Sequence, residues 1–126
     1  MILAQNKTYS FVFFASGDGT NAENLWRFFS TKDFLHAQLL ICDRVDAYVL
    51  ERAKKYQIQS VVIEKNKMDQ KNHEDLILEK LRSYHFDFIL LCGYRRLLSA
   101  HFVGQFKGKI INIHPSLLPK YPGLHA

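Results

Sequence analysis

Residues 9–29 read Y-S-F-V-F-F-A-S-G-D-G-T-N-A-E-N-L-W-R-F-F, and this stretch decides the fold class. The segment 9–15 is almost continuously apolar, which is typical of a strand buried on both faces of a parallel sheet. A glycine turn follows over 16–21, and 22–29 is predicted to be a helix. Strand, turn and helix in this order form the first half of a βαβ unit.

The same alternation continues to the end of the chain. Further strands are predicted over 37–42, 60–63, 86–92 and from 110 to the proline at 115, and further helices over 46–56, 68–84 and 99–106. Asp46 and Ser99 are predicted helix caps. The residues expected to face the core from the helices are Leu25, Phe28, Phe29, Val49, Leu50, Ala53, Leu76, Ile77, Leu81 and Tyr84. Five strand segments alternating with helices predict right-handed crossovers and a mostly parallel sheet. We therefore expect a Rossmann-like three-layer α/β sandwich, formed by one domain over residues 1–126.

Composition limits the class of protein. The chain has 126 residues, 48% of them hydrophobic, which suits one globular domain. No stretch is long enough to span a bilayer, and residues 1–8 lack a signal-peptide core, so we expect a cytoplasmic protein without a membrane partner. Cys42 and Cys92 each end an apolar run, which favours buried free thiols over a disulfide.

The net charge of +5 does not predict a nucleic-acid partner, because the basic residues are scattered and form no stripe with aromatic residues. Small anionic substrates and a solvated basic surface explain the charge equally well. The six histidines show no i, i+4 pair and no carboxylate at ligand spacing, so no metal is predicted.

Two polar residues, Asn112 and His114, interrupt the apolar run I-I-N-I-H at 110–114. Residues two apart on a strand point to the same side, and Pro115 ends the strand because it has no N–H to donate. An amide that can hydrogen-bond a developing oxyanion and an imidazole that can move a proton near neutral pH suit attack of an amine on a carbonyl carbon. The alternative is a strand end that merely carries two polar side chains.

The full run N-I-H-P-S-L-L-P-K-Y-P-G at 112–123 resembles the signature of the folate-dependent formyltransferases, and most closely the branch that formylates glycinamide ribonucleotide in purine (IMP) synthesis. The resemblance extends to S-G-D-G-T-N at 16–21, D-A-Y-V-L-E-R-A at 46–53 and G-Y-R-R-L-L at 93–98. It implies formyl transfer from 10-formyltetrahydrofolate to the amino group of glycinamide ribonucleotide, with these two small molecules as substrates, no metal and a possible homodimer.

The resemblance also implies roles for particular residues. Asn112 would bond the oxyanion, and His114 would stabilise it as imidazolium and relay the proton. Gly19, Thr20 and Asn21 would hold the substrate phosphate. The folate-binding residues would be Arg95, Arg96, Leu97, Leu98, Val103, Asn112 and Lys71. Arg95 departs from the pattern, since many family members have methionine at this position.

In the family a catalytic aspartate lies further on, in a D-x-x-x-G segment that this sequence does not contain. We therefore expect a truncated formyltransferase domain without its C-terminal strands, and weak or absent activity. Two alternatives stay open: a catalytically inactive nucleotide-binding module, and a related formyltransferase with another amine acceptor.

Overall fold

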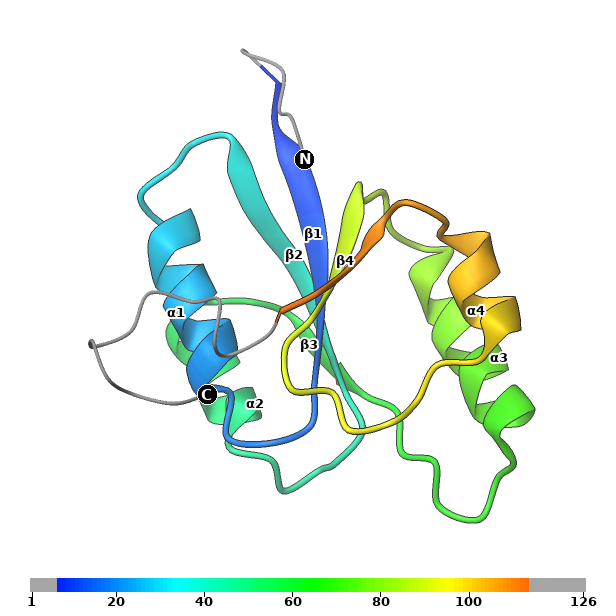
Figure 1. The fold of residues 1–126 in the computed structure, drawn as a ribbon. Helices are drawn as coiled ribbons and strands as arrows, with labels where there is room; N and C mark the ends of the chain where they lie inside the picture. Colours follow the sequence, from blue (N-terminus) through cyan, green and yellow to red (C-terminus); the bar gives the residue numbers. More distant parts are fainter. Residues whose placement is uncertain (1–6, 114–126) are drawn as a thin grey trace, which may run out of the picture.

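The computed structural model describes residues 7–113, which form one five-stranded sheet with helices on both faces (Figure 1). The strands are β1 (Tyr9–Ala15), β2 (Leu35–Cys42), β3 (Ser60–Val62), β4 (Phe88–Leu91) and β5 (Ile110–Asn112). The helices are α1 (Thr20–Phe29), α2 (Val49–Lys55), α3 (Gln70–Leu81) and α4 (Ala100–Gln105). The predicted three-layer α/β sandwich is confirmed.

The strand order is β3-β2-β1-β4-β5, and every neighbouring pair is parallel. The chain builds β1, β2 and β3 outward in one direction, then returns to the other side of β1 for β4 and β5. The switch in direction lies between β1 and β4. In open sheets of this kind ligands bind beyond the carboxyl ends of the strands at such a switch point.

Strand β1 divides the core between the two faces of the sheet. Its residues Phe11 and Phe13 pack with Trp26 and Phe29 of α1 on one face. Its residues Val12 and Phe14 belong to the cluster on the other face, which α3 and α4 cover. Both faces are therefore buried, which explains why the sequence of β1 is apolar at nearly every position.

Two predicted core positions are wrong. Phe28 is 52% exposed and Leu76 is 44% exposed. In α1 the buried residues are Ala22, Glu23, Trp26 and Phe29, and in α3 they are His73, Glu74, Ile77, Leu78 and Leu81. Both misplaced side chains lie on the flank of an amphipathic helix, where an apolar residue can stay in solvent.

The start of α2 also differs from the prediction. The helix begins at Val49 rather than directly after Asp46, and its N-cap, Tyr48, forms no side-chain cap. The carboxylate of Asp46 instead pairs with Arg44 at 3.2 Å. The backbone N–H of Val49 donates to the carbonyl oxygen of Gly17 at 3.1 Å, so the first turn of α2 is held by the loop after β1.

The Ser99 cap is confirmed, since its side chain accepts from the N–H of Phe102. Cys42 and Cys92 are buried and free, as predicted. Within residues 7–113, no helix has the length and apolar character needed to cross a membrane.

Candidate functional site

The glycine turn, residues 16–21, joins the carboxyl end of β1 to α1. Gly19 has a φ of 82°, and a Cβ atom added there would lie 2.3 Å from Cγ2 of Val49 on α2. Both the left-handed backbone and the close approach of α2 require glycine at this position. The turn is thereby held in one shape against two helices.

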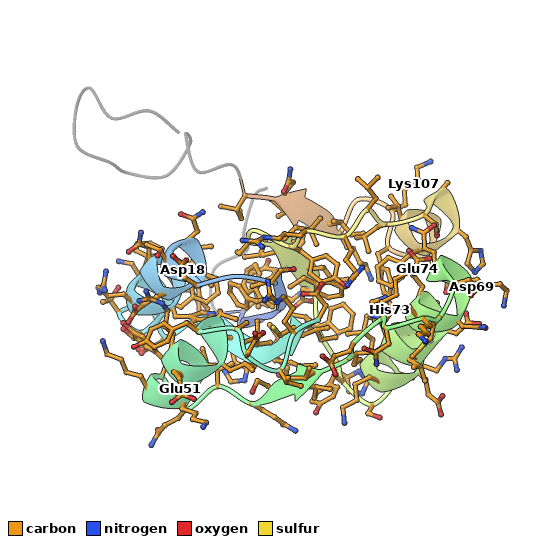
Figure 2. All side chains as sticks on the ribbon, turned by 90° about the horizontal axis from the view of Figure 1, so that it is seen from below. Asp18, Glu51, Asp69, His73, Glu74 and Lys107 are labelled. Carbon is orange, nitrogen blue, oxygen red and sulfur yellow. The ribbon has the colours of Figure 1, made fainter. Side chains whose placement is uncertain are left out.

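Asp18 accepts two hydrogen bonds within this turn, and no pattern in the sequence predicts a role for it. Its Oδ1 accepts from the backbone N–H of Thr20 at 3.0 Å and from the Thr20 hydroxyl at 3.1 Å. These hydrogen bonds, with the nearby charges of Arg52 and Arg95, hold the pKa of Asp18 below its ordinary value of 3.8. The carboxylate is therefore ionised at neutral pH, at the start of α1 (Figure 2).

The loop after β4, residues 93–99, is fastened to the end of β1. The buried Ser16 donates its N–H to the carbonyl oxygen of Gly93 at 3.2 Å, and its hydroxyl accepts from the N–H of Arg95 at 2.9 Å. The glycine turn and the β4 loop, more than 70 residues apart in the chain, are therefore neighbours at the carboxyl edge of the sheet.

Between them lies a cavity of about 410 Å³, here called the glycine-turn cavity. The residues that line it are Gly17, Asp18, Gly19, Thr20, Asn21, Cys92, Gly93, Tyr94 and Arg95. It includes all three residues predicted to hold a phosphate. Burial raises the pKa of the Cys92 thiol to about 12, so this wall carries a neutral thiol at physiological pH.

A second cavity, of about 280 Å³, lies between the β4 loop and α3. Its lining residues are Lys65, Gln70, His73, Glu74, Ile77, Tyr94, Arg95, Arg96, Leu97 and Leu98. Four of the predicted folate-binding residues, Arg95 to Leu98, border this cavity. Val103 and Lys71 are not among the described residues that line either cavity, and Lys71 pairs with Asp75 on its own helix at 2.9 Å.

Two buried carboxylates hold the β4 loop in place. Asp43, at the end of β2, accepts from Nε of Arg96 at 2.8 Å, and its other oxygen, Oδ1, is buried with no hydrogen-bond partner among the described residues. Glu74 of α3 accepts from the N–H and the hydroxyl of Ser99 at 2.8 and 2.5 Å. Figure 2 shows Glu74 and Asp18 on opposite sides of the molecule. No spacing in the sequence indicates these contacts, because their partners are 25 and 53 residues apart.

Asn112 ends β5 beside the end of β4. It is paired in register with Leu91, and the N–H of Ile113 donates to the carbonyl oxygen of Leu91 at 2.9 Å. The residue is exposed and lies on the same edge of the sheet as the β4 loop. His114 lies outside the described residues, so its predicted position beside Asn112 stays a prediction.

The part of the chain that the structure describes contains no group of three or more His, Cys, Asp and Glu side chains arranged to hold a metal ion.

Comparison with known proteins agrees with this geometry. Residues 9–126 match the family model described as "Formyl transferase". The phosphoribosylglycinamide formyltransferase of Bacillus subtilis (strain 168) is 41% identical over 118 residues, covering 92% of this chain and 60% of the relative. The Haemophilus influenzae enzyme of the same name is 42% identical over 113 residues, covering 88% of this chain and 53% of its own length.

Solved structures agree as well. The crystal structure of phosphoribosylglycinamide formyltransferase from Brucella melitensis superposes with a TM-score of 0.81 at 38% identity, covering 94% of this chain and 62% of that one. The chain thus spans a little over half the length of these three relatives. The family match, the sheet order and the cavity beside the glycine turn lead to one assignment: this chain belongs to the formyl transferase family.

Proposed function

We propose that this chain takes part in formyl transfer from 10-formyltetrahydrofolate to the amino group of glycinamide ribonucleotide. The observation that carries the proposal is the meeting of the glycine turn and the β4 loop around one cavity, with Asn112 ending the strand next to β4. The relatives named phosphoribosylglycinamide formyltransferase supply the substrate class.

The glycine turn suits the phosphate of the substrate. Backbone N–H groups at the start of a helix favour an anion, and Gly19, Thr20 and Asn21 line the cavity there. The N–H and hydroxyl of Thr20 already donate to Asp18, so Gly19 and Asn21 are the candidates for binding the phosphate through the backbone. The second cavity, bordered by Arg96, Leu97 and Leu98, suits a planar heterocycle with polar edges, because apolar and polar side chains line it together. We assign the folate to this side, with Val103 and Lys71 as further predicted contacts.

The reaction needs no covalent intermediate with the protein. The amine nitrogen forms a bond to the formyl carbon, the bond from that carbon to the folate nitrogen breaks, and one proton passes from the amine to the departing nitrogen. Negative charge gathers on the formyl oxygen in between. Asn112 would donate to that oxygen, and His114, as imidazolium, would stabilise the charge and move the proton.

Replacement of Asn112 tests the proposal. Loss of one oxyanion donor typically lowers kcat by about 10²–10³-fold, so Asn112→Ala should lose that much while substrate binding by calorimetry is largely retained. Gln105→Ala, which removes an exposed amide on α4, is the control. Turnover is measured as release of tetrahydrofolate, and an Asn112→Ala variant with near-normal turnover would remove this residue from the mechanism.

A cytoplasmic location and a homodimer stay predictions.

A further inference from the structure

We propose that Arg95, which reaches the glycine-turn cavity from the β4 loop, binds the phosphate of the amine substrate there and thereby sets the preference of this site for a phosphorylated ligand. The inference rests on the function proposed above and assigns Arg95 to the substrate phosphate rather than to the folate.

The first argument is the position of the guanidinium. A Cβ atom added at Gly17 would lie 3.4 Å from Nη2 of Arg95, so the head of the arginine lies against the glycine turn. The backbone of Arg95 is fixed by its hydrogen bond to Ser16, which is only 1% exposed. The side chain itself is exposed and lines the cavity together with Gly19 and Thr20. An anchored backbone with an exposed charged head suits a group that receives a ligand.

The second argument is the balance of charge. The carboxylate of Asp18 lies on the same cavity wall and would repel a phosphate. Arg52 is not among the described residues that line the cavity, and its guanidinium bonds the carbonyl oxygen of Asp18 and the carboxylate of Glu23. Among the described residues that line the cavity, Arg95 supplies the positive charge. A guanidinium also offers paired N–H donors that match two phosphate oxygens.

The neighbouring arginine shows what a structural role looks like. Arg96 is held by the buried Asp43 at 2.8 Å and turns toward the end of β2. Arg95 has no carboxylate partner among the ion pairs of the described residues. Arg96 therefore fixes the β4 loop, whereas Arg95 faces the glycine-turn cavity.

Calorimetric titration of the chain with ribose 5-phosphate, ribose and glycinamide ribonucleotide tests the proposal. Arg95→Gln should weaken both phosphorylated ligands by about 10- to 100-fold, the usual effect of losing a charge-assisted hydrogen bond. Arg95→Lys should retain part of that affinity, since lysine keeps the positive charge but lacks the paired N–H donors of the guanidinium. Arg82→Gln, which removes the same charge at the end of α3, should change affinity by less than about twofold. Thermal unfolding checks that each variant is folded.

Each result decides something. Equal binding of ribose 5-phosphate by Arg95→Gln and the unsubstituted chain would overturn this inference and leave the proposed function standing. Loss of affinity for a folate with a glutamate tail, but not for ribose 5-phosphate, would also overturn it and assign Arg95 to a carboxylate. Failure of the unsubstituted chain to bind either phosphorylated ligand would overturn both proposals. Arg95-dependent binding of ribose 5-phosphate by a chain that does not bind a folate would support the inference and contradict the proposed function.

Discussion

Arg52 on α2 donates from Nε to the carbonyl oxygen of Asp18 at 2.6 Å, so a helix that lines neither cavity fixes the glycine turn. The same guanidinium pairs through Nη1 with the carboxylate of Glu23 on α1 and lies over the ring of Tyr48, 5.0 Å from its centroid. One side chain thus joins α1, α2 and the turn between β1 and α1. The shape of the predicted phosphate site depends on this contact.

The first prediction concerns this arginine. Arg52→Lys keeps the charge but cannot reach both acceptors from one ammonium group, so the variant should lose about 1–3 kcal/mol of unfolding free energy. Urea denaturation measures the loss. Lys54→Met, on the same helix but in an exposed pair with Glu51, should change stability by about 0.5 kcal/mol or less. Equal stabilities of Arg52→Lys and the unsubstituted chain would show that the contacts of the Arg52 guanidinium with Asp18 and Glu23 do not stabilise the fold.

The second prediction is a pH dependence that arises from Glu23. The hydrogen bond from Lys55 lowers the pKa of this carboxyl below its ordinary value of 4.5, with a further contribution from Arg52 and opposition from burial. Because the folded pKa is depressed, the stabilisation is complete above the unfolded pKa and is lost as the pH falls through the folded one. Glu23→Gln should therefore be less stable than the unsubstituted chain at neutral pH, and the gap should close below about pH 4.5.

Urea denaturation at a series of pH values from neutral to about 3 measures this gap. Glu51→Gln is the matched control, because Glu51 is exposed and pairs only across the surface with Lys54 in the described contacts. A stability gap for Glu23→Gln that stays constant over the whole range would mean that the charge of Glu23 does not stabilise the fold.

The sequence predicts some elements to the residue and misplaces others for a physical reason. The bounds of β1 are confirmed because a strand buried on both faces leaves an unbroken apolar run. Phe28 and Leu76 were misplaced because apolar spacing alone does not separate the centre of a helix face from its flank. The cap at Asp46 failed because the start of α2 is set by a carbonyl oxygen of the glycine turn, a contact across the fold.

In the candidate site, too, local sequence patterns predict some residues, whereas only contacts across the fold reveal others. Gly19, Thr20 and Asn21 could be found because a glycine turn between a strand and a helix is a local pattern. Asp43, which holds Arg96, could not, since the two residues meet only when β2 and β4 take their places on either side of β1. The orientation of Arg95 toward the turn likewise depends on a contact with Ser16, 79 residues away.

The third prediction compares two glycines that share a left-handed backbone. Gly19 and Gly93 have φ values of 82° and 72°, but a Cβ atom meets Val49 at 2.3 Å in the first case and nothing within 4 Å in the second. Gly93→Ala should cost only the strain of the backbone, about 1–2 kcal/mol. Gly19→Ala should cost more, because α2 must also move away from the turn. Urea denaturation measures the loss of unfolding free energy in each variant. Equal losses would mean that α2 moves away from the turn at no cost in free energy.

The fourth prediction tests the Asp43–Arg96 pair with a double-mutant cycle. Asp43→Asn keeps the shape and removes the charge, whereas Arg96→Met removes the partner and leaves the carboxylate, which is 4% exposed, without its cation. Uncompensated burial of charge is costly, so Arg96→Met alone should lose about 2–4 kcal/mol, less than a fully buried pair because Arg96 itself is 39% exposed. The double variant should recover part of this loss, since the buried charge has gone with its partner. Urea denaturation of all four proteins gives a coupling free energy, expected to be about 1 kcal/mol or more. Additive effects would show that the Asp43–Arg96 pair does not hold the β4 loop, and that Arg96 is available to a ligand.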